Sequence, residues 1–167
     1  MSRLDSFIRR LEAQRSCLAL AVERSRDVPG VVLELGLGNG RTFDHLREIC
    51  AGGPCPREIY VFDRQVAAHP DCIPAADRLF LGDFTATLPK ARARLGDGSA
   101  AFIHVDLGSG DEAASRALAA SLSPDIARLM RPGAVLVSDQ PMADASLHPL
   151  DLPPGVKPGR YFMAEKR

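Results

Sequence analysis

The chain has 167 residues, of which 46% are hydrophobic and 25% charged, and its formal net charge is zero. We expect residues 1–167 to form one domain with its own hydrophobic core. The balanced charge disfavours a nucleic-acid-binding protein, which usually carries a basic face. The chain lacks the roughly 18 consecutive apolar residues of a membrane span, and its N-terminal sequence MSRLDSFIRR is too charged for a signal peptide. We therefore expect a cytoplasmic protein that binds neither nucleic acid nor membrane.

The N-terminal segment, residues 3–26, is predicted to form an amphipathic helix packed on the domain. The apolar residues that recur at helical spacing are Leu4, Ile8, Leu11, Leu18 and Val22. The other face carries arginines, namely Arg9, Arg10, Arg15 and Arg24. Two interpretations are open: a packed helix with solvated arginines, which is the simpler one, or a lid that also contacts a substrate.

Short apolar strands and helices alternate after this segment. The expected strands are residues 31–35, 58–62, 78–81, 100–105 and 134–138. The expected helices are 39–50, 84–95 and 111–130, the last interrupted at Ser123-Pro124 and followed by a turn at 131–133. This alternation predicts βαβ units and a parallel sheet, and therefore an α/β fold.

A glycine-rich segment, Glu34-Leu-Gly-Leu-Gly-Asn-Gly40, joins the first strand to the next helix. Glycines let the backbone turn sharply and approach a ligand, and a helix N-terminus offers free N–H groups. A dinucleotide-binding loop has the spacing GxGxxG. Here the third glycine comes one residue early, and Arg41 stands where the last glycine would be. The spacing therefore disfavours an NAD-binding loop.

Two acidic residues follow the next two strands. Asp63 ends the second strand about twenty residues past the loop, where an acidic residue binds ribose hydroxyls. Asp83 follows the third strand and precedes Phe84. An aspartate after a strand often only caps the next helix. The ordered occurrence of both after consecutive strands favours a ligand-binding role.

Taken together, these motifs resemble class I S-adenosylmethionine-dependent methyltransferases over about residues 31–141. An acidic residue before GxGxG is similar to the first motif of that family. The resemblance implies that S-adenosylmethionine is the cofactor, that Asp83 binds the adenine amino group and that Phe84 lines the ring. The cofactor-binding residues that it implies are Glu34, Gly36, Gly38, Asn39, Gly40, Thr42, Asp63, Asp83, Phe84 and Asp106. The strings ELGLGNGRT and SDQP resemble a small bacterial group of this family that has no assigned substrate.

Catalytic candidates follow the fourth and fifth strands. Asp106 follows the fourth strand, where the family places residues near the transferred methyl group, and Asp139 follows the fifth. In the metal-dependent catechol-type O-methyltransferases, similar positions bind magnesium, which prefers oxygen ligands. Here Gln140 replaces the asparagine of that pattern and Ser109 replaces its lysine base. The cysteines also lack a CxxC pair. We therefore expect no metal.

The C-terminal part breaks the strand–helix rhythm. Residues 140–159 contain five prolines and no helical pattern, so they do not fit the helix of a parallel crossover. Residues 160–165 predict a final strand, antiparallel beside the fifth. The connection then begins and ends at the ligand-binding edge, and we expect it to recognise the substrate, with His148 as a catalytic candidate. A disordered connector is the alternative.

The sequence thus predicts a three-layer, Rossmann-like class I methyltransferase fold. Numbered along the chain, the strands should have the order 3-2-1-4-5, followed by the antiparallel C-terminal strand. The predicted function is methyl transfer from S-adenosylmethionine to a small-molecule acceptor, with Asp106, Asp139 and His148 as catalytic candidates. A non-catalytic S-adenosylmethionine-binding module and an NAD-dependent oxidoreductase are the alternatives. A homodimer is expected, because little beyond the core fold is available to enclose a substrate.

Overall fold

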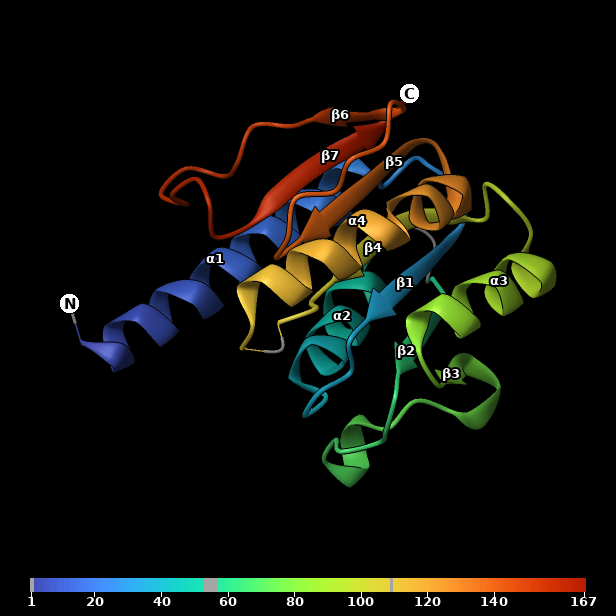
Figure 1. The fold of residues 1–167 in the computed structure, drawn as a ribbon, viewed down its shortest axis with the longest axis horizontal. Coiled ribbons are helices and arrows are strands. Elements are labelled where there is room, and N and C mark those ends of the chain that lie inside the picture. Colours follow the sequence, from blue (N-terminus) through green and yellow to red (C-terminus); the bar gives the residue numbers. More distant parts are fainter. Residues whose placement is uncertain (1, 53–56, 109) are drawn as a thin grey trace.

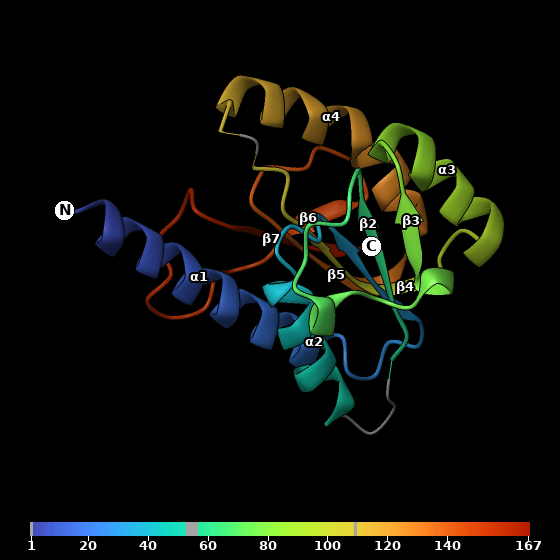
Figure 2. The same cartoon turned by 90° about the horizontal axis from the view of Figure 1, so that it is seen from below.

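The computed structural model describes residues 2–52, 57–108 and 110–167. Helices cover both faces of one sheet (Figures 1 and 2). In chain order the elements are α1 (Arg3–Arg24), β1 (Val31–Leu35), α2 (Arg41–Ala51), β2 (Ile59–Asp63), the short 3-10 helices η1 (Pro70–Cys72) and η2 (Ala76–Arg78), β3 (Leu79–Leu81), α3 (Phe84–Leu95), β4 (Ala100–Val105), α4 (Glu112–Leu129), β5 (Met130–Ser138), β6 (Leu147–Pro149) and β7 (Phe162–Lys166). Within these described ranges, no helix is both long and apolar enough to cross a membrane.

The sheet has the strand order β3-β2-β1-β4-β5-β7-β6. Strands β1 to β5 are parallel to one another, and β7 is antiparallel to β5. The predicted α/β class, strand order and antiparallel C-terminal strand are therefore confirmed. Because parallel strands all end at the same edge, the loops after β1, β2, β3 and β4 meet there.

Two hydrophobic cores lie on the two faces of the sheet. One packs α3 and α4 on the sheet and includes Leu88, Leu122 and Ile126. The other packs α1 and α2 on the opposite face and includes Leu18 and Leu46. All six residues of β4 are buried, as expected for a parallel strand with helices on both sides. The sheet is thus a rigid platform for the loops at its edge.

Only the second half of α1 packs as predicted. Its buried residues are Ala13, Gln14, Cys17, Leu18 and Ala21. Leu4, Ile8 and Leu11, which we expected on the packed face, are 65%, 44% and 39% exposed. A capping box of Ser2 and Asp5 closes the first turn. The first half of α1 therefore forms a regular helix that extends past the sheet (Figure 2).

The predicted interruption of the last helix is wrong. Helix α4 continues through Pro124, which is exposed. A proline inside a helix removes one backbone hydrogen bond. At this point the buried Ser123 hydroxyl donates to the carbonyl of Ala119 at 2.8 Å, and the helix face formed by Leu122 and Ile126 remains buried in the core.

Two further differences involve strands. Residues 131–133, predicted as a turn, belong to β5, whose register against β4 shifts between Ala100 and Phe102. The irregular pairing accommodates Pro132, which has no N–H to donate to a ladder. The connection 140–159 contains the three-residue strand β6, which pairs with β7. A strand this short that ends in proline leaves little signal in the sequence.

Candidate active site

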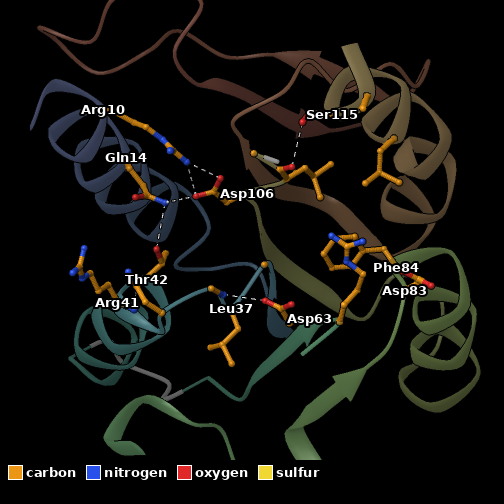
Figure 3. Close-up of a pocket in the computed structure, with 18 of the residues that line it drawn as sticks. Arg10, Gln14, Leu37, Arg41, Thr42, Asp63, Asp83, Phe84, Asp106 and Ser115 are labelled. Carbon is orange, nitrogen blue, oxygen red and sulfur yellow. Dashed lines mark hydrogen bonds and ion pairs between the residues drawn. The ribbon is translucent and has the colours of Figure 1, made fainter. Parts of the chain in front are cut away.

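A pocket of about 660 Å³ lies at the carboxyl ends of β1, β2, β3 and β4, between α1 and α4 (Figure 3). This volume is typical of a small-molecule site. The residues that line it are Phe7, Arg10, Leu11, Gln14, Gly36, Leu37, Gly38, Asn39, Arg41, Thr42, Asp63, Arg64, Asp83, Phe84, Thr85, Asp106, Leu107, Gly108, Ala114, Ser115 and Leu118. Eight of the ten predicted cofactor-binding residues are among them. The two exceptions are Glu34 and Gly40.

The glycine-rich loop forms one wall of the pocket. A Cβ atom on Gly36 would lie 2.4 Å from the carbonyl oxygen of Asp106, so only glycine lets the ends of β1 and β4 approach this closely. Gly38 has no described residue within 4 Å of its Cβ position, which leaves its backbone open to the pocket. Gly40, at φ 85°, precedes α2 and packs against Cys72. Gly40 therefore serves the turn rather than the pocket.

Asp63 is held in place by backbone N–H groups. Gly38 donates to its Oδ2 at 3.0 Å and Gln65 to its Oδ1 at 3.3 Å. Each carboxylate oxygen can accept more than one hydrogen bond. Asp63 is therefore oriented beside the glycine-rich loop with acceptor capacity left for a vicinal diol, as predicted for ribose.

The helix-capping alternative for Asp83 is not supported. Asp83 occupies the N-cap position of α3, but its side chain makes no capping hydrogen bond among the described residues. It is exposed and lines the pocket beside the half-buried Phe84. This places an acceptor next to an aromatic face, which suits a planar base with an amino group.

Glu34 is buried below the pocket floor, contrary to the cofactor-binding role expected for it. Its Oε2 lies 2.9 Å from Nδ1 of His104, and both side chains are fully buried. Burial raises the pKa of Glu34. Burial by itself would lower the pKa of His104, but the Glu34 carboxylate, together with the charges of Asp106 and Asp139, raises that pKa overall. Glu34 and His104 thus share a proton as a structural pair.

Arg10 connects α1 to the pocket floor. Its Nη2 donates to both carboxylate oxygens of Asp106, at 2.8 and 3.0 Å. Gln14, one turn later, lies 3.4 Å from Asp106 Oδ2 and 3.3 Å from the Thr42 hydroxyl. Both side chains point toward Asp106 (Figure 3). Arg10, which we expected on a solvated face, therefore lines the pocket, and the interpretation of this helix as a lid that contacts a substrate stays a prediction.

The structure brings the predicted catalytic residues Asp106 and Asp139 together. Asp139 Oδ1 accepts from the N–H of Leu107 at 3.0 Å. A Cβ atom on Gly108 would lie 3.4 Å from Asp139 Oδ2, 3.6 Å from Asp106 Oδ1 and 3.7 Å from Arg10 Nη2. Burial raises the pKa of Asp139, and the charge of Asp106 adds to this effect. A carboxyl with a raised pKa is the stronger proton acceptor.

His148 lies away from the pocket, so the structure corrects its predicted role. It belongs to β6 and pairs with Glu165 of β7, at the outer edge of the sheet. Residues 140–159 are all described, and none lines the pocket. The connection runs along the sheet to β6 and then returns, where Arg160 Nη2 donates to the Ser6 hydroxyl of α1 at 2.9 Å.

Asp106 and Asp139 are the two residues that would bind a magnesium ion if the site resembled that of the catechol-type enzymes. In the described part of the chain, no group of three or more His, Cys, Asp or Glu residues could hold a metal ion. The guanidinium of Arg10 already binds both oxygens of Asp106. Ser109, which stands in place of the lysine base, lies outside the described residues. The donor set fits an ion pair better than a magnesium site.

Sequence reasoning missed one side of the pocket. Its members come from α1 and the first turns of α4, namely Phe7, Leu11, Ala114, Ser115 and Leu118. The only signal in the sequence was the unusual apolar content of a helix N-terminus that also carries arginines. The residues of α4 gave no such signal, because an alanine-rich helix has no distinctive chemistry.

The strand order is that of the class I methyltransferases, and the pocket lies at the carboxyl edge of the sheet. A profile of the S-adenosyl-L-methionine methyltransferase family matches residues 1–166, and the chain belongs to that family. It is similar to the crystal structure of an S-adenosyl-L-methionine methyltransferase from Silicibacter pomeroyi DSS-3, with 43% identity, a TM-score of 0.90 and 99% of both chains covered. It shares only the fold with the antibiotic-resistance methyltransferase Kmr, at 14% identity and a TM-score of 0.50, over 89% of this chain and 93% of the other. No curated protein matches the chain.

Family membership confirms the predicted enzyme class and cofactor. The protein is an S-adenosylmethionine-dependent methyltransferase. The NAD-dependent oxidoreductase and the non-catalytic binding module, which the sequence left open, are therefore set aside. The acceptor is a separate question, because the family does not identify it.

We predict that Glu34→Gln lowers the pKa of His104 below its ordinary value of 6.5. The amide keeps a hydrogen-bond acceptor but removes the negative charge, so burial then dominates. Because the wild-type pKa is raised, the stability contributed by His104 is fully present below pH 6.5 and is lost as pH rises through the raised pKa. NMR titration of the imidazole measures the shift. Glu58→Gln, which removes a surface carboxylate paired with Arg78, is the control. An unchanged His104 pKa in Glu34→Gln would contradict the assignment.

Proposed function

We propose that the protein transfers the methyl group of S-adenosylmethionine to a small-molecule acceptor bound in the same pocket. The observation that carries the proposal is the division of the pocket into two parts. The ends of β1, β2 and β3 supply Gly38, Asp63 and Asp83 along one part, and α1 and α4 border the other. The second part is bordered by two helices and is suited to a small acceptor.

The chain's own residues fit the cofactor. Asp63 accepts from the ribose hydroxyls, while Asp83 and Phe84 hold the adenine. Gly36, Gly38 and Asn39 present backbone to the remaining part of the cofactor, with Thr42 and Asp106 beside them. When bound, the cofactor supplies an electrophilic methyl group on a positively charged sulfur. Alignment of two reactants in this way is worth on the order of 7–11 kcal/mol.

The two aspartates have different roles. Asp106 is paired with Arg10, which binds both of its carboxylate oxygens. Asp139 has a raised pKa and its Oδ2 faces the Gly108 side of the site. We assign Asp139 as the proton acceptor and Asp106 as the residue that positions Arg10 and the acceptor.

Asp63→Ala should weaken binding of S-adenosylhomocysteine by about 1–3 kcal/mol, because two ribose hydroxyls lose their acceptor. Isothermal titration calorimetry measures the change. Asp77→Ala removes an exposed carboxylate on η2 and should leave the affinity unchanged. Wild-type protein that binds NAD but not S-adenosylhomocysteine would refute the cofactor assignment.

We propose that the reaction is independent of magnesium, since Arg10 holds the carboxylate that a metal would need. Millimolar magnesium and EDTA should give the same melting temperature and the same S-adenosylhomocysteine affinity. Magnesium-dependent stabilisation that disappears in Asp106→Asn would show that the ion binds here.

We propose that the protein is a homodimer in which a partner covers part of α1. Leu4 and Ile8 lie one helical turn apart, are not among the residues that line the pocket, and are 65% and 44% exposed, which is typical of an interaction surface. Light scattering at micromolar concentration should give twice the 18.0 kDa chain mass, and Ile8→Lys should reduce it to the monomer. A monomeric wild-type protein would end this proposal.

A further inference from the structure

The part of the pocket between α1 and α4 has an apolar lining. Phe7 and Leu11 of α1 lie on one side, Leu118 of α4 lies on the other, and Leu107 forms part of the floor. Phe7 and Leu11 are 47% and 39% exposed, so burying them would gain roughly 25 cal/mol per Å² of apolar surface covered. This part of the pocket therefore favours an apolar ligand.

The charges around the pocket already balance. The charged residues that line it are three of each sign, namely Arg10, Arg41, Arg64, Asp63, Asp83 and Asp106. Directly behind the lining, Glu34 and His104 share one proton, and Asp139 adds one negative charge when it is ionised. The cofactor has a sulfonium, an ammonium and a carboxylate group, and so one net positive charge. With cofactor bound the sum is zero, and a charged acceptor would be left without a counter-charge.

Three charged groups converge beside Gly108, which lines the pocket together with Arg10 and Asp106. A Cβ atom on Gly108 would lie 3.4 Å from Asp139 Oδ2, 3.6 Å from Asp106 Oδ1 and 3.7 Å from Arg10 Nη2, so the absence of a side chain leaves these groups open toward the pocket. A hydroxyl group in the pocket in front of Gly108 would have a carboxylate nearby to take its proton. The neighbouring guanidinium then stabilises the negative charge that develops on the oxygen.

We propose that the acceptor is an uncharged, largely apolar hydroxyl compound, bound between α1 and α4 with its hydroxyl beside Gly108 and within reach of Asp139. The inference rests on the proposed function of the pocket. In the reaction, an oxygen lone pair of the acceptor forms a bond to the methyl carbon. The carbon–sulfur bond breaks with its electron pair going to sulfur, and the hydroxyl proton passes to the Asp139 carboxylate and then to water. The products are a methyl ether and S-adenosylhomocysteine.

Three probes with the same ring system test the charge preference: naphthol, naphthoate and the naphthylmethylammonium ion. Each is titrated calorimetrically into the full chain saturated with S-adenosylhomocysteine at neutral pH. Naphthol should bind at least roughly tenfold more tightly than either ion, which corresponds to about 1.4 kcal/mol. Equal or tighter binding of an ion, or failure of naphthol to bind, overturns the inference.

Gly108→Ala tests the position of the hydroxyl. The added methyl group meets its neighbours at 3.4 to 3.7 Å, which is ordinary contact, so the variant should fold. Because the methyl group projects into the space proposed for the hydroxyl, naphthol affinity should fall roughly tenfold while S-adenosylhomocysteine affinity is retained. Gly52→Ala is the matched control, since Gly52 has φ −77° and no described residue within 4 Å of its Cβ position. Unchanged naphthol affinity in Gly108→Ala would place the hydroxyl elsewhere.

The experiments distinguish an error in the proposed cofactor site from an error in the proposed acceptor class. If wild-type protein does not bind S-adenosylhomocysteine, the proposed cofactor part of the pocket is wrong. If it binds S-adenosylhomocysteine but the naphthalene series or Gly108→Ala gives the contrary result, the cofactor part stands and only the acceptor class is wrong.

Discussion

The pairing of Glu34 with His104 is the constraint on which the site depends. A carboxylate buried in the middle of a sheet is destabilising by several kcal/mol unless it is paired, and Glu34 is fully buried in β1. His104 is its direct partner in the register of β1 and β4. A slip of one residue would turn these side chains to opposite faces and leave the carboxylate alone. The same register sets Gly36 against the carbonyl of Asp106, so the buried pair also fixes the floor of the pocket.

This constraint extends to the N-terminal helix through polar contacts. Gln14 lies 3.4 Å from His104 and 3.4 Å from Asp106, and Arg10 pairs with Asp106 one turn earlier. The second half of α1 is held by the hydrophobic core, whereas the first half is held by Arg10 and by the contact of Arg160 with Ser6. The first half of α1, which forms one wall of the pocket, is therefore connected to the centre of the sheet by a few hydrogen bonds. Its apolar side chains are exposed and add little to this connection.

The residues that line the pocket at the ends of β1, β2 and β3 could be predicted from the sequence because their signals are local. The glycine-rich loop, Asp63 and Asp83 each lie at the end of a predicted strand. The carboxyl ends of parallel strands meet at one edge of the sheet, whatever the details of packing. Arg10 could not be assigned this way. Its partner Asp106 is 96 residues distant, and an arginine on an amphipathic helix is usually solvated. Glu34 was misassigned because its position in the motif resembles a ligand contact, whereas its burial depends on the helices that cover β1.

The C-terminal connection shows how a correct topology can still give a wrong site. The segment from β5 to β7 does begin and end at the carboxyl edge, as the antiparallel pairing requires. In between, Leu147 pairs with Lys166, so the chain first runs toward the opposite edge. This path of the chain is stabilised by two interactions: Leu147 is buried against the core, and β6 pairs with β7 at the edge of the sheet. The final strand β7 was predicted from the sequence, but the three-residue strand β6 that pairs with it leaves no pattern, so His148 could not be placed at the edge of the sheet.

The fold and the acceptor part of the pocket place different demands on the sequence. Leu18, Leu46 and Leu122 are buried, and substitution there would leave cavities. Phe7 and Leu11 are largely exposed and contribute little to the core, so folding alone would accept polar residues at both positions. Under the proposed function, both residues face the acceptor rather than the core. Substitutions in α1 and α4 would then change acceptor specificity, while Glu34, His104 and the glycine-rich loop keep the proposed cofactor part of the site in place.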